Sequence, residues 1–233
     1  MELKGFYNMD CMEGMKEIPD NYFDLAIVDP PYGIGENGSR NHTRSKLATA
    51  KSYKAFSGND LTAPDVEYFK ELARVSKNQI VWGANHYISK IPLDSSCWIV
   101  WDKVNGDSDF ADCELALTTF KSAVRMFQFK WAGMLQQNMK NKEFRIHPTQ
   151  KPVALYKWLL KNYAKPKDKI LDTHVGSASS LIACHDMGFE YLGFELDKDY
   201  FKMSSERLEK HKAQINMFID EKDKESILEV ECE

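Results

Sequence analysis

A short acidic, proline-rich and aromatic segment, Asp29-Pro30-Pro31-Tyr32, carries the most specific chemistry in this chain. It directly follows residues 24–28, an apolar run typical of a buried parallel strand. Neither proline can donate a backbone hydrogen bond, so the strand must end here and the chain must leave the sheet. The segment is therefore predicted at the carboxyl end of a buried strand.

The chemistry available to this segment is the activation of an exocyclic amino group on a nucleobase. Such a nitrogen is a poor nucleophile because its lone pair is delocalised into the ring. Asp29 could accept one of its hydrogens and the Pro30 carbonyl the other, at a geometry held by two locked φ angles. Tyr32 offers an aromatic face for an unstacked base. The alternative is a tight turn in which Asp29 caps a loop.

A second set of polar residues also follows predicted strands. Residues 169–171 lead into the small-residue turn 172–179, and the strand 191–194 ends at Glu195. A strand, a small-residue turn and a helix form a nucleotide-binding arrangement, because small side chains let a ligand approach backbone amides. Glu195 lies about 20 residues after the turn, where an acid can accept hydrogen bonds from ribose hydroxyls. Many α/β proteins share this pattern.

Strands and helices alternate along the chain. This alternation predicts an α/β fold with a mostly parallel twisted sheet, helices on both faces and ligands beyond the carboxyl ends of the strands. The further expected strands are 79–82, 97–101, 114–120 and 126–129, and the expected helices are 65–75, 152–163, 180–187 and 198 to about 212.

Composition places the chain among ordinary globular proteins. It has 233 residues, 43% hydrophobic and 28% charged. No apolar run approaches the roughly 20 residues of a membrane span, and residues 1–5 lack the features of a secretory signal, so a cytoplasmic protein is expected. The five cysteines form no CxxC pair and no histidine stands at zinc-ligand spacing, so we expect reduced thiols and no metal.

The distribution of charge matters more than its sum. The net charge of −4 argues against a nucleic-acid partner, yet the loop 36–60 has no acidic residue between its ends. Such a loop is either a phosphate-contacting surface or merely solvated. Its basic side chains are Arg40, Arg44, Lys46, Lys51 and Lys54.

On these residues the chain resembles the N6-adenine and N4-cytosine DNA methyltransferases with a DPPY-type motif. It is similar to their permuted β group, in which the catalytic motif precedes the cofactor motifs. Four further segments stand in the order of that family: Asn8-Met9-Asp10, His147-Pro148-Thr149-Gln150-Lys151-Pro152, the turn 172–179 and Gly193-Phe194-Glu195. The turn departs from the family's Asp-Pro-Phe-x-Gly-Ser-Gly pattern at Thr173, His174 and Ala178.

The resemblance implies a Rossmann-like methyltransferase fold, S-adenosylmethionine as cofactor and methylation of adenine N6 in double-stranded DNA. The target base would be flipped out and the methyl group transferred directly, with Asp29, Pro30, Pro31 and Tyr32 as the catalytic residues. The resemblance also assigns residues to the parts of the cofactor. Asp10 would contact its adenine, Glu195 its ribose, Thr149, Gln150 and Lys151 its methionine end, and Asp172, His174, Val175, Gly176 and Ser177 would wrap its nucleoside and methionine portions.

The resemblance also sets the expected organisation. Residues 1–233 would form a single methyltransferase domain with a small target-recognition region at about 102–146. The basic loop 36–60 would share in gripping DNA. A homodimer and a place in a restriction-modification system are compatible with the resemblance.

Three alternatives stay open. The target could be cytosine N4, although Asp rather than Ser at position 29 favours adenine within the family. The chain could methylate RNA or protein glutamine, but enzymes of those kinds usually carry Asn-Pro-Pro-Tyr and place the cofactor motif first. A DNA-binding protein on a decayed methyltransferase fold is the third, suggested by the altered turn 172–179.

Overall fold

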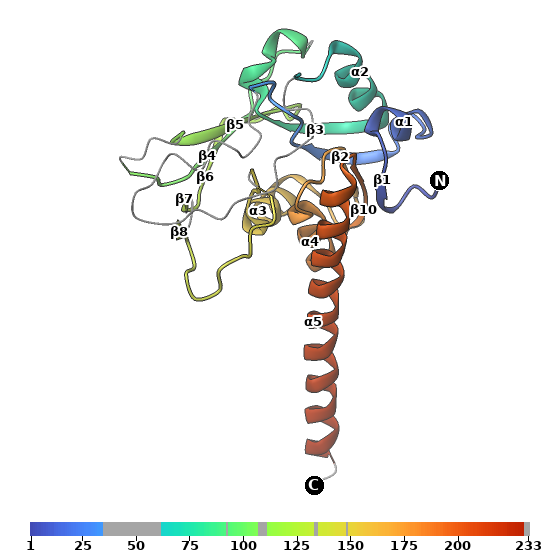
Figure 1. Ribbon diagram of the computed structural model, residues 1–233, viewed down its shortest axis with the longest axis vertical. Coiled ribbons are helices and arrows are strands. Elements are labelled where there is room, and N and C mark those ends of the chain that lie inside the picture. The colour runs from blue at the N-terminus through green and yellow to red at the C-terminus, as the bar shows by residue number, and fades with distance from the viewer. Residues whose placement is uncertain (35–61, 92, 107–110, 133–134, 148, 231–233) are drawn as a thin grey trace.

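The computed structural model describes residues 1–34, 62–91, 93–106, 111–132, 135–147 and 149–230, with backbone alone from residue 215 onward. Within these residues a mixed sheet of eight strands forms the centre of the molecule (Figure 1). The strands lie in the spatial order β1 (Gly5–Asn8), β10 (Glu190–Glu195), β9 (Lys169–Asp172), β2 (Phe23–Val28), β3 (Ser76–Trp82), β5 (Cys113–Thr118), β4 (Trp98–Asp102) and β6 (Arg125–Gln128).

The chain connections from β2 and from β9 lead toward opposite sides of the sheet. These strands are parallel neighbours, with Leu25 opposite Ile170 and Ala26 opposite Leu171. From β2 the chain passes through α2 (Val66–Val75) to β3 on one side, and from β9 through α4 (Ser179–Asp186) to β10 on the other. In open α/β sheets the crevice at such a switch point is where ligands bind.

Helices cover both faces of the sheet (Figure 1). On one face, α1 (Cys11–Lys16) and α2 share a core with Val28 and Val81. On the other, α3 (Val153–Tyr163) and α4 pack against Leu25 and Ile27. Because alternate residues of β2 are buried on opposite faces, this strand is an almost unbroken apolar run.

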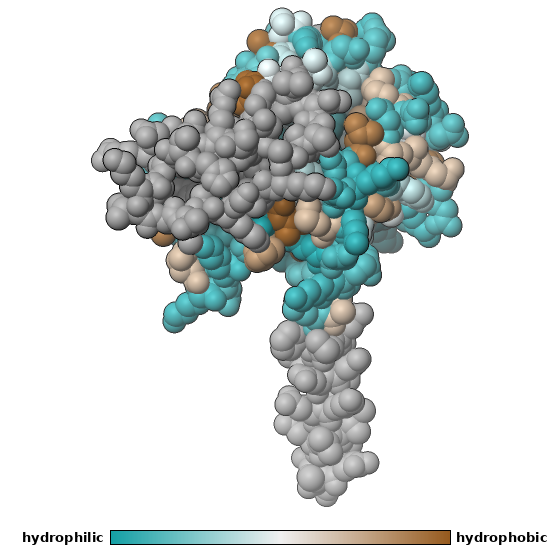
Figure 2. Space-filling model, in the orientation of Figure 1, coloured by the Kyte–Doolittle hydropathy of each residue, from teal (hydrophilic) through white to brown (hydrophobic). Residues whose placement is uncertain are grey.

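The longest helix, α5 (Lys198–Val230), packs near its start against α4, β1 and β10. It then extends away from the sheet (Figure 1). Hydrophilic residues predominate over the described surface in Figure 2, including the first turns of α5. No helix in the described part of the chain is both long enough and apolar enough to cross a membrane.

The α/β architecture and the expected elements are confirmed, with bounds that differ by a few residues. The helix expected to end near residue 212 continues to Val230 as α5. The short elements that were not anticipated include β1, α1 and a small antiparallel pair formed by β7 (Trp131–Ala132) and β8 (Leu135–Gln136). Elements of two to six residues are too short to show a periodic pattern, so their geometry comes from tertiary pairing.

Candidate active site

The Asp29–Tyr32 segment leaves the carboxyl end of β2, as predicted. Pro30 is buried, and the Asp29 side chain is 18% exposed. The Tyr32 hydroxyl donates a hydrogen bond of 2.8 Å to Asp29 Oδ1. The acidic and aromatic members of the motif therefore point toward one another and form one unit rather than two independent side chains.

The ring of Tyr32 is positioned by the chain that follows β3. It stacks on His86, with ring centroids 4.9 Å apart and planes at 14°. A Cβ on Gly83 would lie 2.1 Å from Tyr32 Cε1 and 2.5 Å from both Cδ1 and Cζ, which places it over the face of the ring. Gly83 also has φ +67°, so both its backbone and its missing side chain suit this site. Sequence reasoning did not single out His86, because a lone histidine after a strand carries no pattern.

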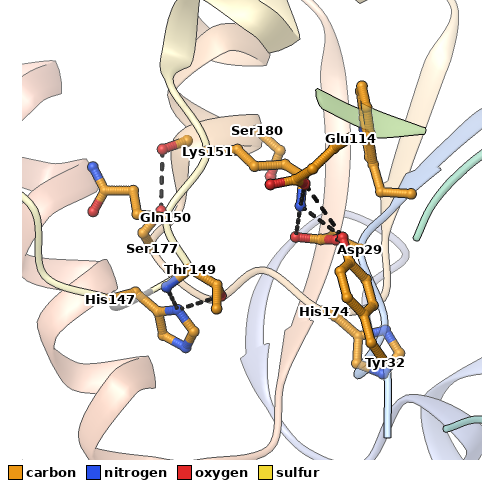
Figure 3. A network of polar contacts seen from close by, with 12 residues as sticks. Asp29, Tyr32, Glu114, His147, Thr149, Gln150, Lys151, His174, Ser177 and Ser180 are labelled. Atoms are coloured by element: carbon orange, nitrogen blue, oxygen red, sulfur yellow. Dashed lines mark hydrogen bonds and ion pairs between the residues drawn. The ribbon is translucent and has the colours of Figure 1, made fainter. Parts of the chain in front are cut away.

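Asp29 is also bound by Lys151, whose side chain is only 3% exposed. The Lys151 ammonium contacts Asp29 Oδ2, lies 2.9 Å from Glu114 Oε2 and donates to the Tyr32 hydroxyl at 3.1 Å. Lys103 completes the group with an ion pair of 2.6 Å to Glu114 Oε1. Figure 3 shows the Lys151 nitrogen between the carboxylates of Asp29 and Glu114.

Burial and charge set the protonation of this group. Burial and the neighbouring charge of Glu114 raise the pKa of Asp29, against the opposing effect of Lys151. Burial would also raise the pKa of Glu114, but Lys151 and Lys103 together lower it to about 2. Burial alone would lower the pKa of Lys151, yet the two carboxylates raise it. Glu114 and Lys151 are therefore charged, and Asp29 is the more basic of the two carboxylates.

The turn after β9 is braced from within. Asp172 Oδ1 accepts a hydrogen bond of 3.0 Å from the His174 amide, and Oδ2 accepts one from the Ser180 hydroxyl. Burial raises the pKa of Asp172 to about 7. The Val175 side chain packs in an apolar cluster with α4 and α5, whereas the Ser177 hydroxyl lies 3.1 Å from that of Ser179. Asp172 thus shapes the turn through backbone and hydroxyl contacts.

Glu195 ties the same turn to β10. Its Oε2 accepts a hydrogen bond of 2.9 Å from the Gly176 amide, and its Oε1 accepts one of 2.9 Å from the Asp197 amide. A Cβ on Gly193 would lie 2.6 Å from Val175 Cγ2, so only glycine lets the turn pack this closely on β10. The two oxygens of the half-buried Glu195 carboxylate have about four lone-pair sites, so the carboxylate keeps acceptor capacity beyond its contacts with backbone amides.

His174 and Asp10 lie beside this turn. The His174 ring contacts Tyr68 edge-on, with centroids 5.5 Å apart, and burial lowers its pKa to about 4, so it is neutral at pH 7. Asp10 follows β1, in which Asn8 pairs with Glu195. Its Oδ1 accepts a hydrogen bond of 2.7 Å from the Met12 amide and so caps α1.

The residues expected at the methionine end of the cofactor are placed differently from one another. Thr149 is exposed, and its hydroxyl lies 3.0 Å from His147 Nδ1. Gln150 is buried, and its Oε1 accepts a hydrogen bond of 3.0 Å from the Ile146 amide. Lys151 reaches Asp29 instead. The segment therefore braces the site with Gln150 and Lys151 and leaves Thr149 accessible.

The expected DNA-contacting residues are only partly described. Arg40, Arg44, Lys46, Lys51 and Lys54 lie outside the described residues. The region at about 102–146 contains β5 to β8; β5 and β6 are strands of the central sheet, and Glu143 adds further contacts to the rest of the fold. Oε1 of Glu143 accepts a hydrogen bond of 3.0 Å from the Val153 amide, and Oε2 lies 2.9 Å from Arg207.

Two curated relatives are similar to nearly the whole chain. The type II methyltransferase M.HinfI of Haemophilus influenzae is 24% identical over 246 aligned residues, which cover 89% of this chain and 68% of that protein. The type II methyltransferase M.HpaI of Haemophilus parainfluenzae is 28% identical over 240 aligned residues, covering 86% and 72%.

Solved structures share the fold. The crystal structure of an M1.HpyAVI-SAM complex superposes with a TM-score of 0.54 at 22% identity, covering 87% of this chain and 98% of that one. The cytosine-N4-specific PvuII DNA methyltransferase gives a TM-score of 0.56 at 14% identity, covering 93% and 92%.

A family model described as DNA methylase matches residues 76–206. The matched segment contains the turn 172–179 and Glu195, and it begins after the Asp29–Tyr32 motif. Because this match extends over more than half of the sequence, the chain belongs to the DNA methylase family.

Proposed function

We propose that this protein transfers a methyl group from S-adenosylmethionine to the N6 amino group of adenine in DNA. One observation carries the proposal. Asp29 follows β2 and the turn 172–178 follows β9, and these two strands are parallel neighbours at the switch point of the sheet. The proposed amino-activating motif and the proposed nucleoside-binding turn therefore stand at the same edge of the sheet, although about 140 residues separate them.

The residues beside the turn fit the proposed cofactor. Glu195 stands at the carboxyl end of β10 with acceptor capacity for ribose hydroxyls, next to a turn held to β10 by the Gly176 and Val175 amides. Asp10 lies after the neighbouring strand β1, where its carboxylate caps α1 and keeps lone pairs for an adenine amino group. The neutral His174 offers an aromatic ring at the position where the family's Asp-Pro-Phe-x-Gly-Ser-Gly pattern has phenylalanine. When bound, the cofactor would supply an electrophilic methyl group.

The chain's own residues would then act on the base. A flipped adenine would stack on Tyr32 and give its two amino hydrogens to Asp29 and to the Pro30 carbonyl. The new N–C bond would form as the S–C bond breaks, and the Asp29 carboxylate would stabilise the positive charge that the nitrogen gains. Asp29 would also take the proton that the nitrogen releases. No cysteine nucleophile takes part in this scheme.

DNA would be gripped by two parts of the chain. We infer that the region at about 102–146 reads the target and that the basic loop 36–60 contacts phosphates. The whole of residues 1–233 would then act as a single methyltransferase domain. The relatives M.HinfI and M.HpaI, both described as type II methyltransferases, support a role in DNA modification.

Methylation of DNA by the purified protein tests the proposal, with digestion to nucleosides and mass spectrometry to identify the product. We expect N6-methyl-2′-deoxyadenosine from the wild type. The Asp29→Ala variant should lose about 100-fold or more of the rate while calorimetry shows unchanged S-adenosylmethionine binding. Asp24→Asn, at the opposite end of the same strand, is the matched control and should stay active.

Three outcomes would contradict the proposal in distinguishable ways. N4-methylcytosine as the product would move the target to cytosine. Absence of cofactor binding would favour a decayed DNA-binding relative. Full activity in a folded Asp29→Ala protein would remove the assigned role of the motif.

A further inference from the structure

Glu114 is a half-buried acid that the motif-based mechanism does not use. It lies on β5, and its side chain is 21% exposed, close to the 18% of Asp29. It reaches the site from a strand two positions away from β2 in the sheet. With Lys103 and Lys151 it completes a compact group of two carboxylates and two ammonium groups whose formal charges cancel.

The contacts of Lys151 show what Glu114 does there. An ammonium group has three hydrogens, and Lys151 has three acceptors: Asp29 Oδ2, Glu114 Oε2 at 2.9 Å and the Tyr32 hydroxyl at 3.1 Å. Glu114 is itself held on its other oxygen by Lys103 at 2.6 Å. The Lys151 nitrogen is thus held from both sides. The contact with Glu114 determines how strongly the positive charge of Lys151 acts on Asp29.

This sharing has a chemical consequence for Asp29. A carboxylate that is the sole partner of an ammonium group is a weak hydrogen-bond acceptor for any further group. When a second carboxylate pairs with the same ammonium group, the first carboxylate retains more of its basicity. Asp29 needs that basicity if it is to polarise an amino group and take its proton.

We propose that Glu114 is a positioning residue of the methyl-transfer site, which keeps the Lys151 ammonium bound to two carboxylates at once so that Asp29 remains a strong hydrogen-bond acceptor for the target amino group. This inference rests on the proposed function, since it assigns Asp29 a role in activating an amino group. It also explains why a lysine lies buried beside a catalytic carboxylate, where it would otherwise weaken that carboxylate as a base.

The other groups that act on Asp29 are known from the same geometry. They come from the motif itself, from the segment after β3, from β5, from the start of α3 and from β9. The titratable side chains concerned are Tyr32, Tyr87, Glu114, Lys151, Tyr156 and Asp172. The three tyrosines have pKa values raised by burial and stay neutral, so Glu114 and Lys151 are the groups whose substitution changes the charge at Asp29 most directly.

The decisive variant is Glu114→Gln, which keeps shape and removes charge. Single-turnover methylation should slow by about 10-fold to 100-fold, with S-adenosylmethionine affinity unchanged. Removing a negative neighbour lowers the pKa of Asp29, so the acid limb of the rate–pH profile should move to lower pH by about half a unit or more. Glu114→Asp, which restores the charge, should bring the limb back toward the wild type.

Lys103→Met provides a second variant, for which the expected displacement of the acid limb has the opposite sign. It removes a positive charge from the same group, so the acid limb should move to higher pH. Asp24→Asn breaks the 2.6 Å ion pair with Lys77 at the other end of β2 and should leave the limb in place. A purely structural role for Glu114 predicts lower thermal stability without these opposite displacements.

One measurement is independent of catalysis. Carbon-13 NMR titration of aspartate carboxyl groups, with Asp29→Asn assigning the resonance, should show the same displacements in the protein without substrate. An unchanged Asp29 titration and an unchanged rate in folded Glu114→Gln would overturn the inference. Displaced titration in a protein that methylates no nucleic acid would instead keep the electrostatic coupling and reject the proposed function.

Discussion

At the residue scale, Tyr32 is held by contacts of three kinds. Its hydroxyl donates to Asp29, its ring stacks on His86, and Gly83 packs over its face. An aromatic platform that is fixed before a base arrives loses little further freedom on binding. The stack therefore pre-organises the proposed base-binding surface.

Gly83→Ala tests this arrangement. The new Cβ would lie 2.1 Å from the Tyr32 ring, so the ring must move away from Asp29 and methylation should fall by about 10-fold or more. Gly188→Ala is the matched control, because Gly188 has φ +73° and no atom within 4 Å of the added Cβ. Both variants should lose roughly 1–2 kcal/mol of unfolding free energy from backbone strain. Steady-state methylation and thermal unfolding provide the two readouts; equal activity in the two variants would reject the positioning role of Gly83.

The residue scale also shows where sequence reasoning stopped. Asp29 and Glu195 were identified because each ends an apolar run, which is a local signal. Glu114 and His86 have no such signal. Their roles depend on neighbours more than 30 residues away, Lys151 and Tyr32 respectively, and only folding brings these together.

At the element scale, α5 and the region at about 102–146 meet on the turn after β9. Arg207 of α5 donates to the Ser177 carbonyl at 2.6 Å and to Ser179 Oγ at 3.0 Å, while its other nitrogen binds Glu143 at 2.9 Å. Burial raises the pKa of Glu143 and lowers that of Arg207, which reflects how little water reaches the pair. The shape of the turn thus depends on two distant elements.

A double-mutant cycle on Arg207→Met and Glu143→Gln measures this link. We expect a coupling free energy of about 0.5–3 kcal/mol in unfolding experiments, because each single change removes the oppositely charged partner of a half-buried group. Either variant should also weaken S-adenosylmethionine binding in calorimetry, since the turn would lose support. The exposed pair Lys70–Glu67 on α2 is the control, with a coupling of about 0.5 kcal/mol or less. Additive effects at Arg207 and Glu143 would show that the contact does not join the two elements.

At the scale of the whole molecule, charge is unevenly distributed. The chain carries a net charge of −4, and residues 220–233 are rich in carboxylates. The loop 36–60, by contrast, is rich in basic side chains. A chain of this kind attracts a polyanion through a local surface and not through its overall charge.

Neutralising the basic loop tests its proposed role in DNA binding. Replacement by glutamine of Arg40, Arg44, Lys46, Lys51 and Lys54 should weaken DNA binding. The slope of log affinity against log salt should become shallower by about 0.9 for each phosphate that the loop no longer neutralises. Cofactor affinity should stay unchanged. Glutamine at Lys70, Lys77 and Lys161, on α2, β3 and α3, is the control. An unchanged slope in the loop variant would make the loop a merely solvated segment.

The α/β class could be inferred from local signals, and so could the order along the chain of the Asp29–Tyr32 motif and the turn 172–179. Buried parallel strands are apolar on both faces, and proline or glycine marks where they end, so residues 24–32 and 169–179 reveal their own positions. The polar residues after such strands must then share one edge of the sheet. These inferences need no knowledge of which strands are neighbours.

Which strands lie side by side, and which side chains they bring together, depends on tertiary structure. Lys151 was assigned to the cofactor by resemblance, yet the fold turns it toward Asp29 and Glu114, and that assignment stays a prediction. The reason is physical: an ammonium group in a site with little water is stable only beside compensating carboxylates, and strand order decides which carboxylates those are. The order β9-β2-β3-β5 brings an acid from β5 to the group around Asp29, and no periodicity along the chain reports that contact.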